Sequence, residues 1–158
     1  MKKILPVILI MVMLITVAAT VNHSTGNEVP YPEGFRNWTH IKTGYVSKEN
    51  PGFGFHHIYA NDIAMQGYRT GSFPEGSIIA FDVIEGLVQP NNNIKEGNRR
   101  HVDVMVKDSI KYKETGGWGY EEYDGDSKTQ KKTTETIQKQ CFNCHASQKD
   151  YVFSDLRN

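Results

Sequence analysis

The residues best suited to chemistry are two cysteines and a histidine in the segment Cys141-Phe142-Asn143-Cys144-His145, close to the C-terminus. This spacing is typical of a c-type haem attachment site, where two thiols bond to the haem vinyl groups and the histidine coordinates the iron. On a helix, positions i, i+3 and i+4 share one face, so both sulfurs and the imidazole would meet the same flat porphyrin. We therefore expect one covalent haem c, with Cys141 and Cys144 as its thioether residues and His145 as the proximal iron ligand.

Two other roles for the cysteine pair agree less well with the sequence. A disulfide would suit an oxidising compartment, but thioredoxin-like redox motifs belong to an alternating strand–helix pattern, which this sequence lacks. A zinc site would need a further pair of Cys or His residues at ligand spacing. The chain has only these two cysteines and no second pair at that spacing.

The N-terminus supports the haem prediction independently. Lys2 and Lys3 precede an apolar run over 4–17, and Val17-Ala18-Ala19 offers a small-residue cleavage site. This pattern predicts a secretory signal peptide over 1–19. The alternative is an uncleaved anchor, but the run is short for a membrane span, which needs about 20 residues. We expect export to a bacterial periplasm, where haem is attached to such motifs.

The rest of the chain is long enough for one domain with a real core. We expect a flexible lead-in over 20–30 and a single haem domain over 31–158. With 18 Lys+Arg against 18 Asp+Glu, the chain is nearly neutral. This balance argues against a nucleic-acid partner and against a polybasic membrane patch, and no stable membrane span is expected after the signal is removed.

The domain reads mainly as strands. Aromatic, apolar or alternating runs predict strands over 53–60, 77–85 and 101–107, and a tight turn at 116–120 leads into another. Asn61 is a suitable N-cap for a short helix that runs to about Arg69. Other expected features are a turn at 73–76, a loop at 90–93, a polar loop over 124–133 and a last short strand at 151–153.

A final helix should begin at Thr133 or Thr134 and carry the haem motif. One stripe of this helix consists of Ile137, Cys141, Cys144, His145 and Gln148. The predicted fold class is α+β, mainly β: a curved antiparallel sheet of about four or five strands, with a short helix and a C-terminal haem-bearing helix packed across it. This pattern excludes the small helical cytochromes c, whose methionine ligand lies well downstream of the motif. Four-helix cytochromes carry the motif at the C-terminus, but the body of this chain reads as strands.

Several segments together resemble the cytochrome P460 family, and within it the cytochrome c′-beta branch. They span almost the whole domain in the expected order: Trp38-Thr39-His40-Ile41-Lys42, His57-Ile58-Tyr59-Ala60-Asn61, Phe73-Pro74-Glu75-Gly76-Ser77, Val104-Met105-Val106-Lys107-Asp108, Thr115-Gly116-Gly117-Trp118-Gly119, Cys141 to Lys149, and Asp150-Tyr151-Val152-Phe153-Ser154. The resemblance implies a mainly β domain, often a homodimer. It also implies one c-type haem with His145 as proximal ligand and an open sixth position.

The resemblance also bears on what faces the open position. Catalytic members oxidise hydroxylamine or nitric oxide and carry a lysine, bonded to the haem, on the strand after the Phe-Pro-Glu-Gly-like turn. Here no lysine occurs between Lys48 and Lys95, and Phe81 occupies that place. The c′-beta branch instead has two phenylalanines over the iron, and Phe81 with Phe53 or Phe55 would supply them.

An apolar distal face decides among functions. A phenyl ring excludes water and offers no lone pair, so nitric oxide and carbon monoxide should bind while ionic ligands lose solvation without compensation. We therefore expect a binder of these gases that scavenges, carries or senses them. An oxidoreductase acting on hydroxylamine or nitric oxide is the first alternative, and a periplasmic electron carrier is the second.

Four residues are candidates for roles around the haem. Arg99 and Arg100 could pair with the propionates, or could mark a solvated loop end. His101 and Asp103 are the catalytic candidates, as proton-transfer groups, if their strand face borders the pocket.

Other side chains are less specific candidates. A lone histidine or methionine in a domain is more often packed or exposed than a ligand, but six could reach the iron: His40, His56, His57, His101, Met65 and Met105. His56 and His57 point to opposite sheet faces, so at most one could face haem. A lysine-rich approach to the final helix is either a solvated surface or a docking patch for an acidic redox partner: Lys128, Lys131, Lys132 and Lys139.

Overall fold

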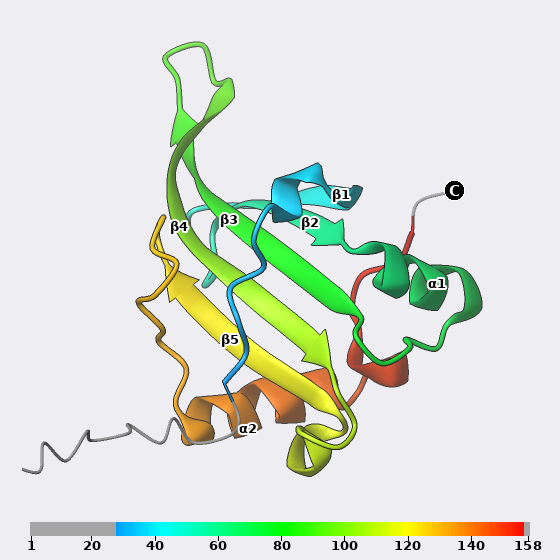
Figure 1. Ribbon diagram of the computed structural model, residues 1–158. Helices are drawn as coiled ribbons and strands as arrows, with labels where there is room; N and C mark the ends of the chain where they lie inside the picture. The colour runs from blue at the N-terminus through cyan, green and yellow to red at the C-terminus, as the bar shows by residue number, and fades with distance from the viewer. Residues whose placement is uncertain (1–27, 157–158) are drawn as a thin grey trace, which may run out of the picture.

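The computed structural model describes residues 28–156. The predicted signal peptide over 1–19 and most of the predicted lead-in lie outside the described residues. In these residues, five antiparallel strands form one sheet in sequential order, so each strand pairs with the strand that precedes or follows it in the chain (Figure 1). The strands are β1 (Thr39–Val46), β2 (Gly54–Ala60), β3 (Ile78–Val88), β4 (Ile94–Lys107) and β5 (Trp118–Asp124). The predicted mainly β class of the α+β fold is confirmed.

Two α-helices accompany the sheet, α1 (Asp62–Thr70) and α2 (Glu135–His145). The side chain of Asn61 begins α1 by accepting from the backbone N–H of Ala64 at 2.8 Å. The helix ends at Gly71, whose φ of 77° is left-handed. Of the two candidate caps for α2, Thr134 accepts from the N–H of Ile137, while Thr133 accepts from Glu122 N–H instead.

Three short 3₁₀ turns complete the described chain, at Phe35–Asn37, Lys113–Thr115 and Lys149–Tyr151. The strand predicted at 151–153 is wrong, because Tyr151 has a φ of 63° and ends a 3₁₀ turn. Left-handed backbone cannot continue an extended strand. The first strand, β1, was not expected from the sequence. It lies at the sheet edge, and Ile41 is its only buried residue.

Side chains on the two sides of the sheet pack into separate cores. The side that carries Ile79, Phe81, Met105 and Tyr120 packs against α1, α2 and the C-terminal tail, and we call it the cavity face. On the opposite face, the segment leading into β1 crosses the sheet (Figure 1). Its Val29 is fully buried there, so this part of the predicted lead-in 20–30 packs against the sheet.

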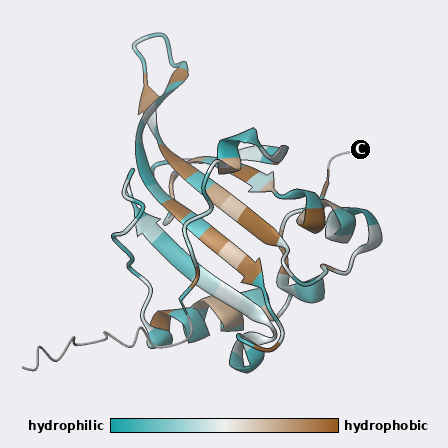
Figure 2. Cartoon of the chain, viewed as in Figure 1, coloured by the Kyte–Doolittle hydropathy of each residue, from teal (hydrophilic) through white to brown (hydrophobic). Residues whose placement is uncertain are grey.

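The β3–β4 hairpin extends beyond the rest of the sheet (Figure 1). The central parts of these strands are hydrophobic, whereas the tip of the hairpin is largely hydrophilic (Figure 2). A hydrogen bond from Gln89 N–H to the Asn93 carbonyl closes the tip, where the sequence predicted a loop. The hydrophobic stretches lie where β3 and β4 face the two cores, so the centre of the sheet provides the rigid support for a site.

Candidate functional site

The end of α2 presents the three residues of the attachment motif together. Because the helix includes 141 to 145, the two sulfurs and the imidazole share one helical face. Both cysteines are free thiols, with Cys141 half-buried and Cys144 exposed. Burial and the nearby Asp103 carboxylate raise the pKa of the Cys141 thiol. A protonated thiol argues against a free catalytic thiolate as its role.

His145 is held in one orientation by the turn that follows it. Its Nδ1 lies 2.7 Å from the carbonyl oxygen of Tyr151, so Nδ1–H donates and Nε2 keeps its lone pair. Burial lowers the pKa of His145, although the hydrogen bond to Tyr151 acts in the opposite direction. The ring lies between those of Tyr120, with centroids 5.1 Å apart, and Phe153, at 4.8 Å. A neutral, fixed imidazole is the form that coordinates a metal.

A cavity of about 360 Å³ separates α2 from the cavity face of the sheet. Apolar and aromatic side chains form most of its wall: Ile79, Phe81, Met105 and Tyr120 from the strands, Ile137 and Cys141 from α2, and Val152 and Phe153 from the tail. Polar lining comes from Asp103, Glu121, Glu122, Thr133 and Ser154. His145 borders the same space, so the imidazole and the apolar wall belong to one site.

Three observations test whether these residues suit a haem. The walls are mostly apolar, as for other cofactor pockets. The Tyr120 hydroxyl is buried in the wall and has no hydrogen-bond partner among the described residues. No residue of α2 is buried, although its Ile137 and Cys141 face the cavity. A flat, apolar group would cover that helix stripe, so the site fits haem, with Cys141 and Cys144 as thioether residues and His145 as the iron ligand.

Within residues 28–156, no group of three or more His, Cys, Asp or Glu could hold a metal ion by itself. An iron bound at His145 would therefore need its other ligands from elsewhere, and a porphyrin would supply them. Of the two methionine candidates, Met105 lines the cavity, and Met65 of α1 is buried in the core between this helix and the sheet.

The three phenylalanine candidates do not lie together. Phe81 lines the cavity. Phe55 pairs with Ile84, three residues along β3 from Phe81, and therefore points to the opposite face. Its ring lies against those of Tyr45 and His57. The ring of Phe53 lies under the Arg100 guanidinium at 3.8 Å. Neither Phe55 nor Phe53 lines the cavity.

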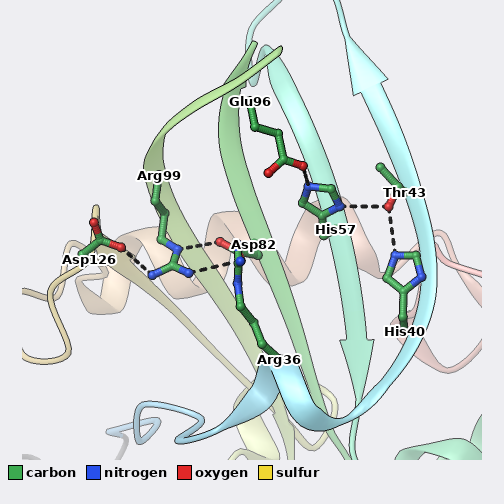
Figure 3. A network of polar contacts seen from close by, with 8 residues as sticks. All are labelled: Arg36, His40, Thr43, His57, Asp82, Glu96, Arg99 and Asp126. Carbon is green, nitrogen blue, oxygen red and sulfur yellow. Dashed lines mark hydrogen bonds and ion pairs between the residues drawn. The ribbon is translucent and has the colours of Figure 1, made fainter. Parts of the chain in front are cut away.

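The ring beside Phe81 is a histidine rather than a second phenylalanine. His56 stands edge-on to Phe81, with centroids 5.2 Å apart, and its Nε2 lies 2.5 Å from the Gly52 carbonyl. The expectation that His56 and His57 point to opposite faces is met. His57 lies on the other face, 2.8 Å from Glu96 and joined through Thr43 to His40 (Figure 3). The sequence signal for His56 was the alternation of β2, which places it on the side of Ile58.

An acidic corner interrupts the apolar wall. Asp103 and Glu122 are cross-strand partners on β4 and β5, and both line the cavity. His101 lies beside them, with Nε2 3.5 Å from Asp103 and Nδ1 4.0 Å from Glu122. The structure thus brings the two candidate proton-transfer residues, His101 and Asp103, together at the edge of the site.

Arg99 takes part in a different network. It lies 2.6 Å from Asp82, which is fully buried and also binds Arg36, and 2.6 Å from Asp126 (Figure 3). Asp82 follows Phe81 on β3, so it faces away from the cavity. The structure does not bring Arg99 to the site, and its role here is to neutralise a buried carboxylate.

The four lysines before and within α2 are each paired with an acidic residue of the same chain. Lys128 pairs with Glu33, Lys131 with Glu28, Lys132 with Glu122 and Asp124, and Lys139 with Glu135. Paired charges attract an acidic partner less than free ones. This arrangement favours the solvated-surface interpretation over the docking patch.

A family model described as Cytochrome P460 matches residues 32–154. The search of curated proteins finds no match. In the described part of the chain, no helix has the length and apolar character needed to cross a membrane.

Proposed function

The chain belongs to the cytochrome P460 family, and we propose that it is an exported cytochrome with one covalent haem c that binds nitric oxide or carbon monoxide. His145 would be the sole protein ligand of the iron. The observation that supports this proposal is the cavity lined by both His145 and Phe81. Phe81 lies on β3 at the position where the family resemblance would place the catalytic lysine. None of the cavity-lining residues among those described is a lysine.

The residues of the wall favour small neutral ligands. The bound haem would supply an iron with one open coordination position. Phe81 and Ile79 offer neither a lone pair nor a hydrogen-bond donor, and they exclude water from their side of the cavity. Asp103 and Glu122 add negative charge close by, which opposes the entry of anions. Neither the loss of solvation nor the negative charge opposes the binding of a neutral diatomic molecule.

Three measurements on the purified protein test this proposal. Mass spectrometry should find one haem on the secreted chain, and the absorption spectrum should be that of five-coordinate haem without the strong red shift of a cross-linked one. Titration should then give tight binding of nitric oxide and carbon monoxide to the reduced protein. A low-spin six-coordinate spectrum in both oxidation states would contradict the gas-binding function and favour the electron carrier.

A second function is favoured by one specific observation, the acidic corner. An oxidoreductase acting on hydroxylamine needs a base near the substrate, and Asp103 with His101 beside it lies where such a base would act. The discriminating assay is hydroxylamine-dependent reduction of a dye. Turnover that disappears in the Asp103→Ala variant, with gas affinity unchanged, would establish the enzyme instead of the binder.

A further inference from the structure

The turn after α2 has an unfavourable backbone. Asp150 and Tyr151 have φ values of 44° and 63°, in the left-handed region that residues other than glycine seldom adopt. Two such residues in succession persist only where the surrounding structure holds them. This turn also supplies the carbonyl oxygen that accepts from His145 Nδ1.

The Asp150 carboxylate accounts for the stability of this conformation. One oxygen accepts from the Phe73 N–H at 2.6 Å, and the other accepts from Lys107 Nζ at 2.8 Å and Trp118 Nε1 at 3.4 Å. These donors come from the loop before β3, the end of β4 and the start of β5. The ion pair with Lys107 is largely buried, with 12% and 17% of the two side chains exposed. One carboxylate therefore binds the turn to the loop before β3 and to the strands β4 and β5.

The neighbouring Tyr151 is fixed as well. Its ring lies over Gly116, where an added Cβ would come within 2.4 Å of the ring. The same ring contacts Phe142 of α2, with centroids 5.6 Å apart. With the Tyr151 ring packed in this way and Asp150 bound to the sheet, the Tyr151 carbonyl is directed toward His145.

We propose that Asp150 is a positioning residue for the iron ligand: it holds the left-handed turn so that the Tyr151 carbonyl accepts from His145 Nδ1. A histidine that donates to a well-placed acceptor becomes more basic and gives more electron density to the iron. Asp150 thereby stabilises the ferric state and strengthens the iron–histidine bond without touching the haem. This inference rests on the proposed ligation by His145.

Two substitutions separate the carboxylate from the backbone strain. Asp150→Asn keeps the shape and a residue that tolerates positive φ, but loses the charge. Asp150→Gly adopts the observed φ freely and loses all three contacts. Asp155→Asn is the matched control, because Asp155 lies in the same tail, is 86% exposed and pairs only with Lys42 in the described structure.

The readouts are the iron–histidine stretching frequency of the ferrous protein, from resonance Raman, and the midpoint potential. We expect the frequency to fall and the potential to rise from wild type to Asp150→Asn to Asp150→Gly, with the control unchanged. If both Asp150→Asn and Asp150→Gly have the wild-type frequency and potential, the carboxylate does not position the ligand and the proposal fails, even if the variants unfold at lower temperature.

A third variant covers the case in which both Asp150 substitutions prevent folding. Lys107→Met removes the ion pair but leaves Asp150 its contacts with Phe73 and Trp118, so a smaller shift in the same direction is expected. An unchanged frequency in this variant would also count against the proposal. Wild-type protein without attached haem would refute the proposed function itself, which distinguishes that failure from a failure of the positioning role.

Discussion

Phe81 on β3 and Asp103 on β4 are direct cross-strand partners, so a phenyl ring and a carboxylate stand side by side on the wall of one cavity. The next partner across the sheet is Glu122 on β5, a second carboxylate. The wall therefore changes from apolar to acidic over the spacing of neighbouring strands, about 5 Å. Because of this contrast, the effect of water exclusion on ligand binding and the effect of negative charge can be measured separately.

The Phe81→Ala substitution should admit water to the open side of the site. We expect a ferric spectrum with a water ligand, and gas association about ten-fold faster because the ring no longer obstructs the iron, measured by flash photolysis. Phe55→Ala is the matched control, since its ring packs on the opposite face against Tyr45 and His57. Equal effects of the two substitutions would contradict the assignment of Phe81 to the distal wall.

The Asp103→Asn substitution should improve the binding of anions and leave neutral gases unaffected. Removing one charge near the site changes the energy of an anionic ligand by about 1 kcal/mol, or roughly five-fold in affinity. Azide titration of the ferric protein measures this change, and carbon monoxide titration of the ferrous protein provides the reference. Asp124→Asn, on the next strand and outside the cavity lining, should have a much smaller effect.

Substitution of the two cysteines and substitution of His145 should have different effects on the haem. Cys141→Ser or Cys144→Ser leaves one thioether, whereas the double substitution should release all haem on acid–acetone extraction. His145→Gly should keep the covalent haem but lose the imidazole ligand, and added imidazole should restore the spectrum. A covalent haem in the double variant would refute the assignment of the thioether residues.

The Asp82→Asn substitution tests the face opposite the cavity. Asp82 is fully buried between Arg36 and Arg99, so the loss of its charge leaves the largely buried Arg99 with only its exposed partner Asp126. We expect a loss of about 3 kcal/mol in the free energy of unfolding, measured by urea denaturation, with an unchanged haem spectrum. Asp126→Asn breaks the ion pair of the same Arg99 with an aspartate side chain that is 82% exposed. This change should lower the free energy of unfolding by less than about 1 kcal/mol.

The pH dependence of stability should reveal the Asp150 ion pair. Burial alone would raise the pKa of Asp150, but hydrogen bonds from Lys107 and the Phe73 amide outweigh it and hold the pKa below its ordinary 3.8. A carboxyl whose folded pKa is lowered adds stability above its unfolded pKa and loses it as the pH falls through the folded value. Between about pH 5 and 2 wild type should therefore lose more stability than Asp150→Asn. Parallel curves would contradict the ion pair.

Local patterns in the sequence predicted the central strands and marked the attachment motif, although β4 begins at Ile94 rather than at the predicted His101. The alternation of Val102 and Val104 with His101 and Asp103 predicted which side chains share a face, and the register of β4 agrees. The Cys141-to-His145 segment carries its own spacing rule. Both signals depend only on neighbours within the same element, and for that reason a single sequence contains them.

Long-range relationships were not accessible in the same way. The choice between Phe53, Phe55 and His56 beside Phe81 depends on the register of β2 against β3, which no local pattern specifies. Arg99 was expected near the haem propionates, but a bulge in the β3–β4 pairing accompanies its contact with Asp82. The carboxylate of Asp150 finds donors 32 to 77 residues away, and this separation hides its role from the sequence.

The strictly sequential order of the five strands has a consequence for biogenesis. Every strand pairing joins chain neighbours, so the sheet can assemble from successive hairpins with little loop-closure entropy. The segment with both thiols follows the last of these strands in the chain, so the sheet can form before this segment packs against it. An enzyme that attaches haem could therefore act on this segment after the sheet has formed. Packing of the segment and its porphyrin against the sheet would then be the last step of maturation.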